Sequence, residues 1–347
     1  MALRFGIIGC GGIAGIHAEA MAKLAGQGVA KLVAGADSFE PSRKKFSEKW
    51  KVPVHDTIEA LLARPDIDAV TIASPSGLHG EHITMAAKAK KHILSEKPLD
   101  TRVDKAEAAV RAARDNGVVL GGIFQQRYLP TPTKVKRAID AGLFGQIVMV
   151  HCETPWYRSN EYYAQAAWRG TWDLDGGVLS NQSPHMIDRM LWLGGDVEEV
   201  ISATCKAGYL RKIEAETLAV VTVRLKNGAL GTITGTTLAY EGLPQRLLIC
   251  GTDGSAAFSG DELVYFKTRE PFNDPADEEK VITDIPGTNR AADPLSMNIE
   301  PHVRNIRDFC EAIRDGRPPM VSAEDGLRVV RLLEEIYTKA GVGPYAK

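Results

Sequence analysis

A short apolar strand that runs directly into a glycine-rich turn is the feature that most constrains the fold of this chain. Residues 5–8 read as a buried strand, and Gly9, Gly11 and Ala14 follow with the spacing G-x-G-x-x-A. An apolar helical pattern begins at Ile13. In such a turn the first glycine permits a tight bend, the second admits a pyrophosphate, and the third small residue keeps the helix close to the sheet. The N-terminus therefore predicts a doubly wound α/β domain that binds a dinucleotide.

The predicted cofactor contacts continue from this turn to the end of the next strand. Gly12 and Ile13 open the helix, where backbone N–H groups attract phosphate. Asp37 follows the strand-like run 30–36 directly. Its separation from the glycine motif is close to the usual value of about 20 residues between such a motif and the acidic residue that binds ribose. A carboxylate there accepts ribose hydroxyls and repels a 2′-phosphate, so we expect NAD, with NADP as the less favoured cofactor. The alternatives are that Asp37 only caps the following turn, or that Arg43 and Lys44 bind a phosphate.

Size, charge and cysteine usage exclude several classes of protein. The chain has 347 residues, 44% of them hydrophobic, which is enough for two domains. Its net charge of −2 gives no reason to expect a nucleic-acid or membrane partner. The five cysteines form no C-x-x-C pair, which argues against a disulfide framework or a zinc site and favours reduced thiols in the cytoplasm.

The pattern of apolar residues changes part of the way along the chain. Short strands alternate with helices through residues 1–123, which predicts a parallel sheet covered on both faces, the dinucleotide-binding Rossmann domain. Residues 124–347 contain consecutive strands joined by hairpins, which predicts an α+β domain with a mostly antiparallel sheet. The last helix, about 324–340, is expected to pack back on the first domain. The polar segment 268–297 reads as a long loop.

A lysine follows one of the predicted parallel strands. Glu96, Lys97 and Pro98 come directly after the strand-like run 92–94, and ligands of doubly wound folds bind at the carboxyl ends of the strands. Lys97 is therefore a candidate catalytic and cofactor-binding group that hydrogen-bonds a substrate hydroxyl. Glu96 is expected to hold the loop beside the cofactor. Outside this setting, Glu-Lys-Pro is a common surface tripeptide.

A second polar segment follows the preceding predicted strand. Ser74, Ser76 and His79 lie where they would approach the cofactor from the same side. His79 and His82 could suggest a metal, but no H-E-x-x-H motif is present and no cysteine lies nearby. We expect no metal here, and we expect these histidines to cap or orient the start of a helix.

A third group of polar side chains belongs to the second half of the chain. Asn181, His185 and Asp188 are spaced four and three residues apart, so they would share one face if the segment is a continuous helix. A histidine that is neutral near physiological pH suits removal of an alcohol proton, and a nearby amide or carboxylate can fix its tautomer. The alternative is a buried structural histidine bonded to Asp188.

Aromatic and arginine side chains gather in the segment 154–172, which reads as a loop on the substrate side. Aromatic faces stack on sugar rings, and arginines hold hydroxyls, carboxylates or phosphates. Tyr157, Arg169 and Trp172 are the candidates for substrate contacts. An aromatic interface between subunits is the alternative.

Together these segments resemble the glucose–fructose oxidoreductase/inositol dehydrogenase family, usually called Gfo/Idh/MocA. The resemblance covers nearly the whole chain and includes the runs 78–82, 126–130 and 324–326. It implies a Rossmann domain and a C-terminal domain whose open sheet packs against another subunit in a homodimer or homotetramer. It also implies substrate contacts for Arg127 and Asp188.

The resemblance implies hydride transfer between the nicotinamide of NAD(P) and a secondary hydroxyl carbon of a sugar, inositol or sugar derivative. His185 would accept the hydroxyl proton and Lys97 would polarise the oxygen. Many relatives carry an aspartate where this chain has Asn181; an amide takes up no proton at neutral pH but still hydrogen-bonds a hydroxyl or an imidazole. Two alternatives stay open, an NAD-dependent glycosidase that oxidises its sugar transiently and a non-catalytic nucleotide-binding sensor.

Overall fold

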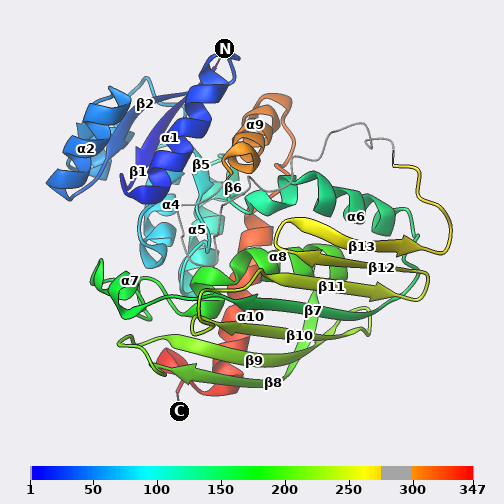
Figure 1. The fold of residues 1–347 in the computed structure, drawn as a ribbon. Coiled ribbons are helices and arrows are strands. Elements are labelled where there is room, and N and C mark those ends of the chain that lie inside the picture. Colours follow the sequence, from blue (N-terminus) through cyan, green and yellow to red (C-terminus); the bar gives the residue numbers. More distant parts are fainter. Residues whose placement is uncertain (1, 275–297, 347) are drawn as a thin grey trace. The chain divides into compact units, whose positions relative to one another are not determined.

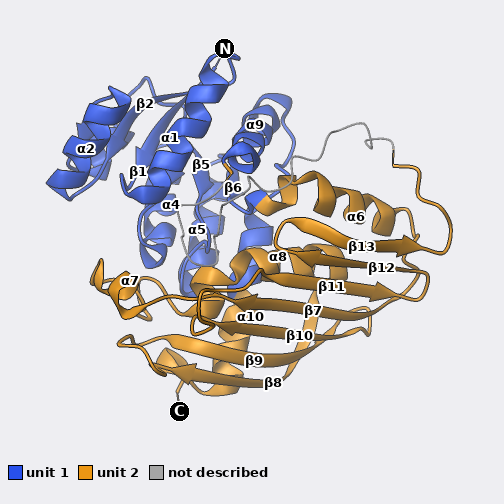
Figure 2. Ribbon diagram, in the orientation of Figure 1, with its two compact units in different colours: residues 1–125, 299–330 blue, residues 126–298, 331–347 orange. Residues whose placement is uncertain are grey.

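The computed structural model describes residues 2–274 and 298–346, so residues 275–297 of the predicted polar loop lie outside the described residues. The chain forms two compact units (Figure 2). Unit 1 comprises residues 1–125 and 299–330, and unit 2 comprises residues 126–298 and 331–347. None of the helices in the described part of the chain combines the length and the apolar character needed to cross a membrane.

Unit 1 is built on a parallel sheet (Figure 1). In their order across the sheet, its described strands are β3 (Val54–His55), β2 (Ala30–Ala36), β1 (Leu3–Ile8), β4 (Ala69–Ile72), β5 (His92–Ser95) and β6 (Leu120–Gly122). All neighbouring pairs are parallel. The strand order reverses between β1 and β4, which is the point where ligands bind in sheets of this kind. The doubly wound sheet predicted from the sequence is confirmed.

Helices cover both faces of this sheet because its strands are apolar on both sides. The helices of unit 1 are α1 (Gly12–Ala25), α2 (Glu40–Trp50), α3 (Ile58–Leu62), α4 (His79–Lys88), α5 (Val103–Asp115), α9 (Glu300–Asp315) and the first part of α10 (Ala323–Ala340). Buried side chains of α1 and α9 pack with Phe5 and Ala69. Those of α3, α4, α5 and α10 pack with Val70 on the opposite face.

Unit 2 is built on a second, mostly antiparallel sheet, as the sequence predicts. In order across the sheet, its described strands are β13 (Glu262–Thr268), β12 (Gly254–Ser259), β11 (Arg246–Gly251), β7 (Ile147–Pro155), β10 (Leu230–Thr236), β9 (Glu216–Leu225) and β8 (Val197–Ala207). β7 and β10 pair in parallel, and the other neighbours are antiparallel.

The two faces of the second sheet differ in their exposure. On β9, Val221 and Val223 are buried, whereas Val220 is 53% exposed. The helices of this unit are α6 (Pro130–Asp140), α7 (Asn160–Ala164), α8 (Pro184–Gly194) and the end of α10. The described part of the chain as a whole also has short helical turns at Ser76–Leu78, Gln125–Tyr128, Val178–Gln182 and Gly343–Tyr345. α8 packs against β7 and β11 on the buried face.

Helix α9 lies far along the sequence from the strands of unit 1, and Phe309 is the residue that tests whether this helix is part of that unit's core. The Phe309 ring is fully buried, its centroid lies 6.3 Å from that of Phe5, and it fills the space beside Gly121. We expect Phe309→Ala to lower the free energy of unfolding by about 3–5 kcal/mol, because it leaves a cavity. Thermal and denaturant unfolding measure this. Arg314→Ala, at an exposed position of the same helix, is the control, and equal stability of the two variants would contradict the assignment.

Candidate active site

The glycine turn after β1 is shaped for close approach of another group. Gly9 has φ +88° and donates its N–H to the Ala36 carbonyl at 2.8 Å. A Cβ at this position would come within 2.7 Å of the Ser74 nitrogen, so only glycine fits. A Cβ at Gly11 would meet no atom within 4 Å, and no side chain caps the N-terminus of α1 at Gly12 and Ile13. This exposed helix N-terminus fits a pyrophosphate.

Asp37 joins the end of β2 to the glycine turn. Its carboxylate accepts the Cys10 N–H and the Phe39 N–H, both at 2.8 Å. Arg43 donates to the carbonyls of Asp37 and Ser38. Asp37 therefore caps the turn, as the alternative interpretation suggested. This contact leaves acceptor sites for ribose, because a carboxylate offers about four lone-pair positions.

His79 ties together the loops that follow β4 and β5. It is buried at the start of α4, and its Nδ1 and Nε2 contact the carbonyls of Pro98 and Ser74 at 2.6 and 2.8 Å. Burial lowers the pKa of His79, and the two carbonyls, which accept only from ring N–H groups, oppose that shift. The Ser74 hydroxyl also contacts His82 at 2.9 Å. Ser76 follows in the same loop, at the start of a short helical turn.

Lys97 lies in the turn that His79 holds. It is half-buried, its N–H donates to the Glu96 carboxylate at 3.2 Å, and the Lys97–Pro98 peptide bond is cis. The glycine turn, the Ser74 loop and the Lys97 turn thus form one connected edge at the carboxyl ends of β1, β4 and β5. The sequence predicted these loops to lie together, and unit 1 brings them together.

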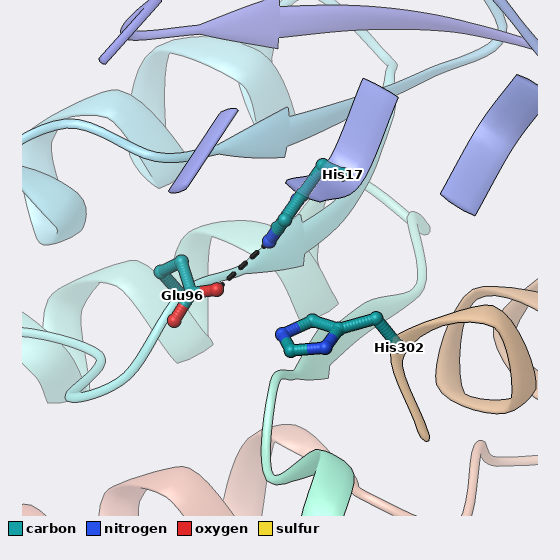
Figure 3. Close-up of side chains that lie close together, drawn as sticks. All are labelled: His17, Glu96 and His302. Atoms are coloured by element: carbon teal, nitrogen blue, oxygen red, sulfur yellow. Dashed lines mark hydrogen bonds and ion pairs between the residues drawn. The ribbon is translucent and has the colours of Figure 1, made fainter. Parts of the chain in front are cut away.

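Glu96 is hydrogen-bonded to His17 and lies near His302, two histidines that the sequence analysis did not single out. His17 Nε2 contacts Glu96 Oε1 at 2.8 Å (Figure 3). His17 Nδ1 contacts the Thr71 hydroxyl at 2.6 Å. The His302 ring lies 5.9 Å from that of His17. Burial would raise the pKa of Glu96, but the hydrogen bond and charge of His17, with the charges of His302 and Lys97, hold it down to about 2.

His17, Glu96 and His302 are of residue types that bind metal ions. Their ligand atoms all lie within 4.8 Å of one another, and all three side chains are buried. The direct contact between His17 and Glu96 occupies the space where an ion would have to lie between them. A Zn²⁺ ligated by both would hold nitrogen and oxygen about 2.0–2.2 Å from itself and more than 3 Å from each other. The cluster therefore fits a buried ion pair that fixes Glu96.

Asn181 and His185 belong to different elements. Val178–Gln182 forms a single π-helical turn, and α8 begins after Ser183. The Asn181 N–H donates to the Gly177 carbonyl at 2.9 Å, and its amide donates to the Asp175 carboxylate. His185 is half-buried in the first turn of α8. The condition for a shared helix face is therefore not met, because a new helix starts at Ser183 and Pro184, before His185.

Asp188 forms a buried ion pair with Arg127. Both side chains are almost fully buried, and the guanidinium meets the carboxylate through two hydrogen bonds of 2.5 and 2.7 Å. The guanidinium carbon also lies 5.3 Å from the centre of the Trp192 ring. These contacts connect α8 to the segment before α6. The substrate contacts predicted for the two residues stay predictions.

The predicted substrate segment places its three candidates in different surroundings. The Arg169 guanidinium stacks on Tyr162 and Trp168, 4.3 and 4.9 Å from the ring centres. The Tyr157 ring meets that of Tyr240 edge-on at 5.7 Å. Trp172 packs edge-on against Tyr337 at 5.2 Å, and a Cβ at Gly343 would overlap its ring. Of the three, Trp172 has the most evident packing role.

Two buried acids beside the π-helical turn were not given a role from the sequence. Asp175 accepts the Gly170 N–H at 2.7 Å, and Glu216 at the start of β9 accepts the Leu179 N–H at 2.8 Å. Asp175 directly precedes the Gly176–Gly177 pair, and this pattern could have indicated a role for it from the sequence. No sequence pattern around Glu216 indicates a role for it, because its hydrogen-bond partners come from other elements.

Comparison with known proteins supports the same assignment of fold and chemistry. Residues 3–124 match the family described as "Oxidoreductase family, NAD-binding Rossmann fold", and residues 133–257 match the "GFO/IDH/MocA C-terminal domain". The inositol 2-dehydrogenase of Rhizobium meliloti is 27% identical over 96% of each chain. An uncharacterized oxidoreductase of Bacillus subtilis, YrbE, is 30% identical over 73% of this chain and 72% of its own.

The fold also matches solved structures. The WlbA dehydrogenase of Bordetella pertussis, solved with NADH and UDP-GlcNAcA, superposes with a TM-score of 0.86 at 32% identity, covering 98% of this chain and 97% of that one.

The buried ion pair gives a stability prediction. We expect Asp188→Ala to lower the free energy of unfolding by about 3–5 kcal/mol, because it leaves the Arg127 charge buried without its carboxylate. The double variant Arg127→Met/Asp188→Leu should recover much of that loss, since no uncompensated charge remains. Unfolding followed by calorimetry measures both. Additive losses in the double variant would show that the pair is not coupled.

Proposed function

Because the chain belongs to the Gfo/Idh/MocA family of NAD-binding oxidoreductases, we propose that it transfers a hydride between NAD and a secondary hydroxyl carbon of a sugar, an inositol or a sugar derivative. One observation carries the proposal. His79 connects the Lys97 turn to the Ser74 loop, and Gly9 of the glycine turn lies directly against that loop. A lysine is thereby fixed at the edge of the sheet that fits a dinucleotide.

In this mechanism, NAD supplies the hydride acceptor when it is bound. Lys97 donates a hydrogen bond to the hydroxyl oxygen and stabilises the charge that develops there. His185 takes the hydroxyl proton, since an imidazole is the usual general base near neutral pH. Asn181, held by Asp175, donates a hydrogen bond to the substrate or to the imidazole and takes up no proton.

We further propose that the two parts of the chain bind different ligands. Residues 1–123 bind the cofactor, with phosphate at Gly11 and Gly12 and ribose at Asp37, which favours NAD over NADP by charge. Residues 124–347 bind the substrate. On the substrate side, Tyr157 and Arg169 offer an aromatic face and a cation, the combination that sugars and sugar acids need. Support for this class comes from the inositol 2-dehydrogenase relative and the WlbA structure with UDP-GlcNAcA.

A substrate screen tests the function. We expect absorbance of reduced cofactor to rise with NAD, and less with NADP, for at least one member of a panel of inositols, aldoses, sugar acids and UDP-GlcNAcA. Cofactor reduction must accumulate in proportion to substrate oxidised. Release of an aglycone without net NADH would indicate the glycosidase instead. Tight NADH binding with no turnover on the whole panel would indicate the sensor.

The catalytic roles give a prediction by mutation. We expect Lys97→Ala and His185→Ala each to lower kcat on the substrate found by about 10²–10⁴-fold, the usual contribution of acid–base groups, while the Kd for NADH changes little. Stopped-flow kinetics and NADH fluorescence titration separate the two effects. Lys90→Ala, an exposed lysine of the same unit, is the matched control. Near-normal kcat in both site variants would refute the assignment.

The outer face of the second sheet supports a homodimer or homotetramer. Met149, Val220 and Leu230 lie on neighbouring strands of this face and are 44%, 53% and 51% exposed. Exposed apolar side chains grouped on one sheet face are typical of a surface covered by another protein. We propose that a second copy of the chain covers it.

Charge on this face should weaken the assembly. We expect the double variant Val220→Glu/Leu230→Glu to shift the molar mass from that of an oligomer toward that of the monomer, because burying two carboxylates opposes association. Light scattering after size exclusion measures the mass. Leu210→Glu, exposed outside the strands, is the control. An unchanged mass in the double variant would contradict this interface.

A further inference from the structure

Glu216 is a buried acid that contacts both the turn before α8 and helix α10. Its side chain is fully buried at the start of β9. Oε1 accepts the Leu179 N–H at 2.8 Å and the Tyr337 hydroxyl at 2.9 Å. The Leu179 bond crosses from the sheet to the π-helical turn, and the Tyr337 bond crosses from α10. One carboxyl oxygen therefore links three elements of unit 2.

The second oxygen of Glu216 has a different environment. Oε2 is buried and has no hydrogen-bond partner among the described residues. It lies against Gly177, where an added Cβ would overlap both Oε2 and the backbone oxygen of Glu216. The chain can pass this close only because residue 177 is glycine. The Gly176–Gly177 pair of the sequence is thus explained in part by the acid that it covers.

The turn on which Glu216 acts carries the candidate site. Gly177 accepts the Asn181 N–H through its carbonyl, and Val178 accepts the Ser183 N–H at 2.8 Å. α8 and His185 follow directly. A shift at Leu179 would therefore move Asn181 and the first turn of α8.

We propose that Glu216 is a positioning residue that fixes the Gly177–Ser183 turn through Leu179, and that it does so in its neutral, protonated form. The inference rests on the proposed function, which assigns roles to Asn181 and His185. A neutral carboxyl suits this place, because a charged one would be buried with an unpartnered oxygen. Loss of the proton leaves a buried charge with one unpartnered oxygen, and that cost favours opening of the turn to water, which displaces the site.

The surroundings place this protonation near neutral pH. Burial raises the pKa of Glu216 to about 7, the hydrogen bonds from Leu179 and Tyr337 lower it, and the charge of Asp175 raises it. Tyr337 on α10 is buried and Cys205 on β8 is half-buried, and the loss of solvent raises the pKa of both, so both are neutral at this pH. The folded state thus keeps a proton that an unfolded carboxyl loses near 4.5, and the contribution to stability declines as pH rises from about 4.5 to about 7.

Hydrogen exchange tests the proposal without a substrate. Amide exchange of the peptide 176–183 is compared between the wild type and Glu216→Gln from about pH 6 to pH 8.5, since glutamine keeps the Oε1 acceptor and cannot ionise. We expect equal protection at pH 6 and protection about tenfold lower in the wild type at pH 8, where most of Glu216 has lost its proton. Glu335→Gln, which alters another carboxylate that accepts a backbone N–H, is the control and should match the wild type.

Two further measurements keep the test decisive. Tyr337→Phe removes a donor that lowers the pKa, so the loss of protection should move to higher pH, even where Glu216→Gln does not fold. On any substrate found, kcat of Glu216→Gln should lack the component that follows this transition, with the Kd for NADH unchanged. Identical pH dependence in wild type, Glu216→Gln and Tyr337→Phe overturns the proposal. The exchange effect without turnover on any substrate rejects the proposed function and leaves the hold of Glu216 on the turn established.

Discussion

The close approach of three loops at the carboxyl edge of the parallel sheet is the constraint on which the rest of the cofactor unit depends. Gly9 can lie against Ser74 only because it lacks a side chain. His79 then fixes Ser74 to Pro98 through both ring nitrogens. A neutral imidazole has one N–H, so His79 donates to one of the two carbonyls and satisfies an acceptor that would otherwise lack a partner. A lysine and a phosphate-binding turn thus become parts of one rigid edge, although they are far apart in the sequence.

Buried charge is used in the same way in both units. Glu96 meets His17, and Arg127 meets Asp188, each pair buried and directly hydrogen-bonded. Removing such charges from water is unfavourable, so each pair holds its partners in one geometry more than it adds net stability. Each pair also adjoins a candidate catalytic residue in the chain: Glu96 precedes Lys97, and Asp188 follows His185 by one helical turn. These two buried pairs therefore serve mainly to fix the position of the residues that form them and of their neighbours in the chain.

The sequence was sufficient where the signal is local and periodic. The glycine turn, the alternation of strands and helices in the first part of the chain, and the helix over Pro184–Gly194 all follow from neighbouring residues. Local reasoning left open whether Asn181 and His185 share one helix, and the structure places them in different elements. The break comes at Ser183 and Pro184, because proline has no N–H with which to continue the helix. The Leu179 N–H bonds to Glu216 of a distant strand, and no pattern around residue 179 encodes that contact.

What the sequence alone determined is the set of elements and the chemistry they carry: a dinucleotide turn, a lysine after a strand, and a histidine at the start of a helix. Only the tertiary structure decided which polar groups are buried and what they meet. Asp37 proved to cap the glycine turn, Asp188 to pair with Arg127, and Glu216 to hold the turn before α8. The reason is physical: periodicity reports which face of an element is apolar, whereas the partner of a buried charge is set by contacts between residues distant in the chain.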